Sequence, residues 1–154
     1  LDKNLRIRSF DKNNSIAELE IMRQLANSIF QDSRNFVKLS ENEFTSLYEE
    51  SISQIEPNFV EIVETLDKKP VGFCFSIPNP RNKTQMMLKT IGVIPSYQRS
   101  GVGSALLYSQ HKKAQDSGFE EFYYPLIRVG NNVTKLPFIG YTIVTEYHSF
   151  TLST

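Results

Sequence analysis

The most informative stretch of the chain is Ile91-Gly92-Val93-Ile94-Pro95-Ser96-Tyr97-Gln98-Arg99-Ser100-Gly101-Val102-Gly103-Ser104-Ala105-Leu106-Leu107. An apolar segment ends at a proline, and a loop with two glycines leads into residues with helical spacing. Glycine adopts backbone angles that are closed to other residues. Backbone N–H groups at the start of a helix lack partners within the helix and carry partial positive charge. The stretch therefore predicts a strand, loop and helix that together bind the phosphates of an anionic cofactor.

The spacing of these glycines excludes two common nucleotide-binding motifs. The Rossmann motif requires G-x-G-x-x-G and the P-loop requires G-x-x-x-x-G-K-[ST], and neither occurs here. The pattern Gln98-x-x-Gly101-x-Gly103, preceded by Val93-x-Pro95, instead resembles the coenzyme A loop of the Gcn5-related N-acetyltransferases, the GNAT family. In that family the pattern is (Arg/Gln)-x-x-Gly-x-(Gly/Ala). The alternative is a helix that begins after two flexible glycines and binds no ligand.

Length and composition narrow the class of protein. The chain has 154 residues, of which 40% are hydrophobic, so we expect one domain over residues 1–154. Lys and Arg number 17, as do Asp and Glu, and no basic patch stands out, which argues against nucleic acid as a partner. No apolar run approaches the ~20 residues of a membrane span. The single cysteine, Cys74, cannot form an internal disulfide and favours a cytoplasmic location.

Hydrophobic periodicity and turn residues predict the order β, α, α, β, β, β, α, β, a short turn, β. The predicted strands cover 5–10, 59–66, 71–77, 86–93, 121–129 and 141–152. The predicted helices cover 15–30, 41–52 and 101–116, and residues 78–83 are expected to form a loop. Capping boxes at Ser15–Glu18 and Ser40–Glu43 indicate where the first two helices begin.

This order of elements is similar to that of the GNAT fold from the first strand to the last. Smaller similarities are Val71-Gly72-Phe73, which resembles the family's third strand, and Phe138-Ile139-Gly140-Tyr141, which resembles its closing element with tyrosine in place of phenylalanine. The resemblance implies an α/β (α+β) class and the acyl-CoA N-acyltransferase fold. In that fold a mixed sheet is flanked by helices, and its two central strands splay apart to admit the cofactor.

The resemblance also implies acetyl-CoA or coenzyme A as co-substrate, and it implies the residues that hold it. The Val93 N–H would polarise the thioester carbonyl and stabilise the oxyanion. Many family members have arginine at the position of Gln98, so Arg99 or Lys112 is a candidate for the missing charge. Asn131 would bond the pantetheine arm, with Asn132 as the alternative. The full set of implied cofactor contacts is Ile91, Gly92, Val93, Gln98, Arg99, Ser100, Gly101, Val102, Gly103, Ser104 and Asn131.

The acid and the base of the reaction are less well defined. Family members often place a tyrosine four residues before the closing glycine, but this chain has Leu136 there. Tyr141, Tyr147 or a water is a substitute acid. The base candidates are Glu61 and Glu64, which strand alternation puts on opposite faces of the sheet. For either carboxylate the alternative is a solvent-facing strand residue. No cluster of residues has metal-ligand spacing, so no metal is expected.

The function that the resemblance implies is acetyl transfer from acetyl-CoA to a primary amine, by direct attack in a ternary complex. The acceptor would be a small molecule or a peptide, set by the first two helices and the loops near 31–40 and 78–84. The alternative is a non-catalytic module that binds coenzyme A, because the usual tyrosine is missing. The long last strand makes a homodimer plausible. His111 is expected on the exposed side of its helix, and Cys74 in the core.

Overall fold

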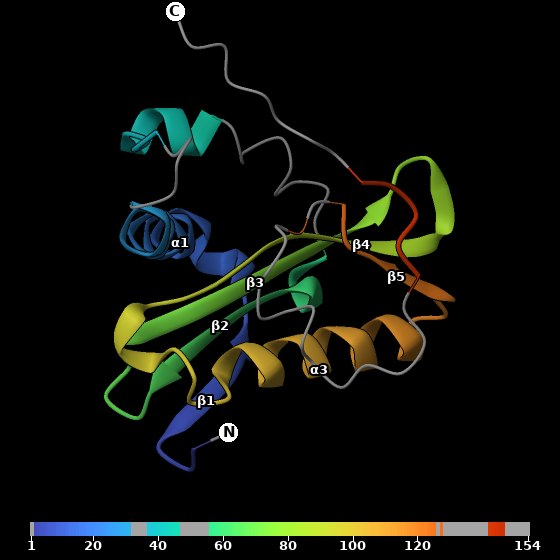
Figure 1. Ribbon diagram of the computed structural model, residues 1–154. Helices are drawn as coiled ribbons and strands as arrows, with labels where there is room; N and C mark the ends of the chain where they lie inside the picture. Colours follow the sequence, from blue (N-terminus) through green and yellow to red (C-terminus); the bar gives the residue numbers. More distant parts are fainter. Residues whose placement is uncertain (1, 32–36, 47–55, 126, 128–141, 147–154) are drawn as a thin grey trace, which may run out of the picture.

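The computed structural model describes residues 2–31, 37–46, 56–125, 127 and 142–146. Five strands form one mixed sheet in the order β1-β2-β3-β4-β5, and helices α1 and α3 cover its two faces (Figure 1). The strands are β1 (Leu5–Ser9), β2 (Val60–Thr65), β3 (Pro70–Asn79), β4 (Asn82–Val93) and β5 (Glu121–Tyr123). The helices are α1 (Ser15–Phe30) and α3 (Val102–Asp116). The predicted fold, a mixed sheet between helices, is confirmed.

Strand β2 shows how the sheet separates two cores. Its residues Val60 and Ile62 pack toward α1, together with Leu19, Met22 and Phe73. Val63, on the other face, packs toward Leu106 and Leu107 of α3. Because both faces are covered, β2 is buried from Val60 through Glu64. Any polar side chain on this strand must therefore find a partner inside the protein.

Strand β4 carries a β-bulge in its pairing with β3. The pair Phe75 and Thr90 is followed directly by the pair Ser76 and Leu88, so Lys89 is the extra residue. A bulge interrupts the strict alternation of side chains between the two faces of a sheet. Lys89 and Thr90, which are adjacent in the sequence, can therefore face the same side.

The pairing of β4 with β5 ends early. These two strands run parallel, and their pairs are Gln85–Glu121, Met86–Phe122 and Met87–Tyr123. From Leu88 to Val93, β4 has no strand on this side within the described part of the chain. Pro125 lies two residues beyond the last pair, and proline has no N–H to extend a ladder. The predicted parting of the two strands is thus confirmed.

The predicted loop at 78–83 is wrong. Strands β3 and β4 extend through it to a tight hairpin, with Asn79 paired to Asn82 and the Asn79 side-chain oxygen accepting from the Arg81 N–H at 3.0 Å. Pro78 argued against a strand, but the ladder shifts register directly after it. Such irregularities tolerate a missing N–H.

The capping box predicted at Ser15 is also wrong. The residue before α1 is Asn14, and the Ser15 hydroxyl instead donates to the Lys12 carbonyl at 2.7 Å. Glu18 does not reach back to the helix start, because it accepts a hydrogen bond from Arg8. At the second box the Ser40 N–H donates to Glu43 at 2.9 Å, and residues 41–46 are helical. That second box is therefore confirmed.

The last predicted strand, 141–152, is not seen where the chain is described. Residues 142–146 are exposed and belong to no strand, and the rest of this range lies outside the described residues. The homodimer inferred from this strand stays a prediction. Residues 47–52, 126, 128 and 129, in two other predicted elements, also lie outside. Within the described residues, no helix has the length and apolar character needed to cross a membrane.

Candidate functional site

Helix α3 begins with backbone N–H groups that no side chain caps. Its N-cap is Gly101, which has no side chain to offer, and no cap hydrogen bond is present there among the described residues. The first bond within the helix runs from the Ala105 N–H to the Gly101 carbonyl at 2.9 Å. The N–H groups of Val102, Gly103 and Ser104 therefore precede the hydrogen-bonded ladder. Such donors form an anion-binding site.

The loop before α3 has an unusual backbone. Arg99 and Gly101 both have positive φ, 65° and 85°. Non-glycine residues rarely adopt this conformation, and it is often found at ligand sites. Two side chains hold the loop in place: the Ser100 hydroxyl donates to the Tyr97 carbonyl at 2.5 Å, and Gln98 Nε2 donates to the Val93 carbonyl at 3.2 Å. We call residues 98–104 the N–H loop.

The N–H loop is open to a ligand. A Cβ built on Gly101 would have no atom of the described residues within 4 Å. Arg99 is exposed in the same loop. Lys112 is bound to Asp116 at 2.8 Å and lies roughly 15 Å along α3 from Val102. Of the two candidates for the charge missing at Gln98, only Arg99 is placed at the loop.

The C-terminal half of β4, residues 88–93, presents backbone N–H groups along the edge where no described strand pairs with it. The Ile94 N–H donates to the Val71 carbonyl of β3 at 2.9 Å, and the register pairs Gly92 with Phe73. Backbone groups alternate in direction along a strand. The N–H groups of Ile91 and Val93 therefore point away from β3, toward the side where β5 has parted from β4. This direction is the one that the predicted role of Val93 requires.

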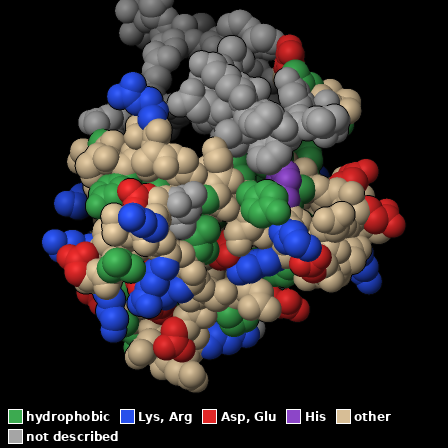
Figure 2. Space-filling view, turned by 90° about the horizontal axis from the view of Figure 1, so that it is seen from below, with side chains coloured by type: hydrophobic (Ala, Val, Ile, Leu, Met, Phe, Trp, Pro, Cys, Tyr) green, Lys and Arg blue, Asp and Glu red, His purple; other side chains and the backbone are tan. Residues whose placement is uncertain are grey.

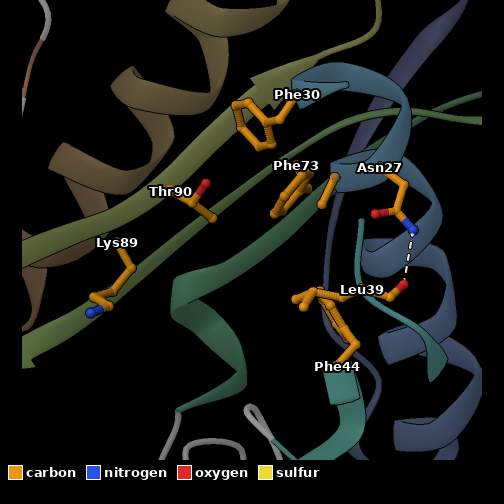
Figure 3. A pocket seen from close by; sticks show the side chains of 8 residues that line it. Asn27, Phe30, Leu39, Phe44, Phe73, Lys89 and Thr90 are labelled. Carbon is orange, nitrogen blue, oxygen red and sulfur yellow. Dashed lines mark hydrogen bonds between the residues drawn. The ribbon is translucent and has the colours of Figure 1, made fainter. Parts of the chain in front are cut away.

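A pocket of about 230 Å³ lies on the opposite face of the sheet, beneath the C-terminal half of α1 (Figure 3). Its walls come from α1, from residues 39–44 and from strands β3 and β4, and they are mostly apolar. The lining residues are Ala26, Asn27, Phe30, Leu39, Phe44, Phe73, Lys89 and Thr90. The Asn27 amide donates to the Leu39 carbonyl at 3.3 Å and ties two of these walls together. We call this space the α1-face pocket.

Strand β4 joins the pocket to the backbone edge. Thr90 lines the pocket, and the next residue, Ile91, presents its N–H at the edge. Gly92 allows α1 to lie close to this strand, because a Cβ there would come within 2.9 Å of Ile29 Cδ1 and 3.3 Å of Phe30 Cζ. A ligand in the pocket and a ligand along the edge would therefore meet at residues 90–93.

Glu61 lies on the α3 face, away from the pocket. It is 1% exposed, and its carboxylate accepts hydrogen bonds from Ser109 at 2.6 Å and Gln110 at 2.8 Å. Its ion pair with Lys113 spans 2.7 Å. Three residues of α3 thus occupy both oxygens, and the arrangement attaches the helix to the sheet. The geometry does not support the predicted role of Glu61 as a base for an amine in the pocket.

Glu64 is on the α1 face, as strand alternation predicted. Arg6 and Arg8 each donate to it at 2.7 Å, and Arg8 also bonds Glu18 of α1 at 2.7 Å. Burial by itself would raise the pKa of Glu64, but the hydrogen bonds from Arg8 and Arg6 hold that pKa below its usual value. Both carboxylate oxygens are occupied by arginines, so Glu64 too has a structural role.

Sequence reasoning missed a pair of titratable side chains beside the parting strands. His111 of α3 lies 2.7 Å from the hydroxyl of Tyr124, measured from Nε2, and its ring centroid is 4.3 Å from that of Phe122. The expectation of an exposed His111 is wrong, because these aromatic side chains, more than ten residues after His111 in the sequence, fold back on α3. Burial lowers the pKa of His111 and raises that of Tyr124. Tyr124 therefore keeps its proton at neutral pH.

Several predicted site residues lie outside the described part of the chain. They are Asn131, Asn132, Leu136, Tyr141 and Tyr147. Cys74 is fully buried as expected, and burial raises the pKa of its thiol. Within the described residues, no group of three or more His, Cys, Asp or Glu side chains could hold a metal ion.

Comparison with known proteins identifies the family. The chain belongs to the acetyltransferase (GNAT) family, whose sequence model matches residues 19–134. Enzymes of this family use acetyl-CoA as co-substrate. No curated protein matches the chain.

Solved structures agree in fold. An aminoglycoside acetyltransferase from an uncultured soil metagenomic sample, in complex with sisomicin, is 19% identical with a TM-score of 0.65, covering 97% of this chain and 99% of its own. A GNAT acetyltransferase from Brucella melitensis, in complex with acetyl-CoA, is 16% identical with a TM-score of 0.65, covering 85% and 80%. The ribosomal-protein-S18-alanine N-acetyltransferase from Escherichia coli is 18% identical with a TM-score of 0.59, covering 85% and 72%.

Proposed function

We propose that this protein transfers an acetyl group from acetyl-CoA to a primary amine by direct attack in a ternary complex. One observation carries the proposal: the uncapped N–H groups at the start of α3 lie beside the open backbone edge of β4, where a Cβ on Gly103 would be 4.0 Å from Val93 Cγ2. A phosphate-bearing ligand with a long amide arm fits this combination. The loop suits the charged end of such a ligand, and the edge suits the amide arm.

Several groups of this chain would bind different parts of acetyl-CoA, the acetyl donor. The N–H groups of residues 102–104 would bind the pyrophosphate, with Arg99 adding positive charge. Ile91 would bond the arm as a neighbouring strand does. The Val93 N–H would donate to the thioester carbonyl, and this bond would strengthen as the oxyanion forms. The directions of the Ile91 and Val93 N–H groups follow from the pairing of β4 with β3.

The amine would enter from the α1-face pocket. An amine attacks only in its neutral form, so it must lose a proton before or during the reaction. The described residues that line the pocket include no carboxylate. Water would therefore accept the proton of the amine.

Tyr124 is our candidate for the group that protonates the leaving thiolate. It directly follows β5 at the point where the two strands part, and its hydroxyl bonds to His111. We expect Tyr124→Phe to lower kcat by about 100-fold while the melting temperature still rises with acetyl-CoA. Tyr123→Phe, one residue earlier in β5, is the matched control and should leave kcat unchanged. An unchanged kcat in Tyr124→Phe would eliminate this role.

Two measurements on the wild-type protein test the proposed function. A ligand that binds only the folded state raises the melting temperature, so acetyl-CoA and coenzyme A should each do so. Release of free thiol from acetyl-CoA should then depend on an added amine. Absence of both thermal shifts would overturn the proposal. Thermal shifts without amine-dependent release across small amines, amino acids and peptides would favour the non-catalytic module instead.

A further inference from the structure

We propose that the α1-face pocket binds an acceptor with a hydrophobic body and a carboxylate, as in an α-amino acid with an apolar side chain. This inference rests on the proposed function and specifies its substrate class. Three features of the pocket carry it: its size, its apolar walls, and a lysine that a β-bulge places among its lining residues.

The size of the pocket sets the size of the group that enters it. A cavity of 150 Å³ lined by apolar side chains holds a benzene molecule, and the α1-face pocket measures about 230 Å³. It therefore accommodates one aromatic ring or one branched aliphatic chain with a few further atoms. A ligand built of several sugar rings would extend far beyond it.

The walls select for an apolar group. Phe30 and Phe73 lie near each other on one part of the lining, and Leu39 and Phe44 lie together on another part (Figure 3). Burial of apolar surface is worth about 25 cal/mol per Å², so these walls stabilise a hydrophobic side chain. A polyamine would bring charged groups against them, and the loss of hydration would oppose its binding.

Lys89 supplies the only charge among the described lining residues. As the extra residue of the bulge, it lines the pocket together with its neighbour Thr90, which regular strand alternation would forbid. Lys89 is exposed, and no ion pair joins it to any described residue. An ammonium ion at the mouth of an apolar pocket complements an anion that projects from an apolar ligand, and it repels polycations.

These features place the parts of the ligand relative to the backbone edge. The apolar group would fill the pocket and the carboxylate would meet Lys89. The amine would then lie near Thr90, one residue before the donors on β4. In the reaction the amine nitrogen forms a bond to the acetyl carbon and loses a proton to water. The carbon–sulfur bond breaks, and the leaving thiolate takes up a proton to become a free thiol.

Rates with three amines and acetyl-CoA test the inference. L-Phenylalanine supplies ring, amine and carboxylate, 2-phenylethylamine lacks the carboxylate, and sisomicin is a polycation. We expect kcat/KM for L-phenylalanine to exceed that for 2-phenylethylamine by about tenfold, as expected for one charged contact. Sisomicin should be the poorest substrate of the three.

The variant Lys89→Met isolates the charge. It should lower kcat/KM about tenfold for L-phenylalanine, mainly through KM, and leave 2-phenylethylamine unaffected. Lys83→Met, exposed on the same strand and outside the pocket, is the control and should change neither. Equal effects of Lys89→Met on both substrates would overturn the inference, as would a preference for sisomicin.

The two proposals fail in different ways. If acetyl-CoA raises the melting temperature and sisomicin alone is acetylated, acetyl transfer stands and the substrate class proposed here is wrong. If none of the three amines reacts although acetyl-CoA binds, the substrate class is again wrong. Absence of any thermal shift with acetyl-CoA overturns the proposed function itself.

Discussion

The N–H loop and the α1-face pocket lie on the two sides of β4 and differ in the chemical groups that form them. The loop uses backbone groups of one continuous segment, residues 98–104, next to the edge of β4. The pocket uses side chains from α1, residues 39–44, β3 and β4. Figure 2 shows the side of the molecule that carries α3. Acidic and basic side chains are mixed there, and neither sign of charge dominates.

This difference separates what each region can recognise. Backbone donors bind any phosphate of the right shape, and changes of side chain affect them only through the backbone conformation. A pocket of side chains can change its specificity with one substitution. A cofactor site made of backbone groups and an acceptor site made of side chains would let the members of one family bind a common co-substrate and many different acceptors.

The largest expected effect is at the loop, with the substitution Gly101→Glu. It places a carboxylate where the pyrophosphate would bind, and we expect the affinity for acetyl-CoA to fall by roughly 100-fold or more. Gly118 is the matched control, because it lies at the other end of α3 with φ of 86° and, like Gly101, would have no atom within 4 Å of a Cβ.

Both substitutions carry the same backbone strain, about 1–2 kcal/mol for a left-handed residue with a side chain. Gly101→Glu and Gly118→Glu should therefore lower the melting temperature of the free protein similarly. Only Gly101→Glu should abolish the rise caused by acetyl-CoA. If both variants kept that rise, or both lost it, the loop would not be the cofactor site.

The next effect concerns Glu61 on the α3 face. Glu61→Gln removes the charge that holds Lys113, Ser109 and Gln110, and we expect it to lower the free energy of unfolding by about 2–3 kcal/mol. Urea denaturation measures this, with the exposed Glu120→Gln as a control of little effect. A catalytic base would give another result: near-normal stability, a greatly reduced kcat and loss of the acidic limb of the pH profile.

The smallest effect concerns His111 and pH. Burial lowers its pKa in the folded protein, so between that pKa and about 6.5 the unfolded chain binds more protons than the native one. The free energy of unfolding should therefore decrease as pH falls through this window. His111→Gln should reduce this slope, measured by urea denaturation between pH 7.5 and 5.0. An identical slope in both proteins would mean that His111 titrates normally in the fold.

Local patterns predicted much of the α3 side. Gly101 and Gly103 predicted the loop and the start of the helix, where Gly101 has a positive φ, and Gly118 has a positive φ just beyond its end. There Gly118 donates to Gln115 at 3.0 Å and Phe119 to Ala114 at 3.0 Å. These features depend on residues within a few positions of one another, so a short stretch of sequence is sufficient evidence for them.

The interaction partners of Glu61, Glu64 and His111 could not be predicted from nearby residues. Strand alternation put Glu61 and Glu64 on opposite faces, but their partners Lys113 and Arg8 are distant in the sequence. Likewise the partner of His111 is Tyr124, which directly follows β5. Which charged groups meet is decided by packing, and a periodic pattern does not contain that information.

Local sequence patterns were sufficient to predict the order of the elements from β1 to β5, the family and the loop that begins α3, because backbone conformation follows from nearby residues. They did not predict that Lys89 joins Thr90 at the α1-face pocket, since the bulge arises from the register between β3 and β4. Nor did they predict the residue at which β5 leaves β4, because strand pairing joins residues far apart in the chain. Register and packing are properties of paired segments, and no single segment specifies them.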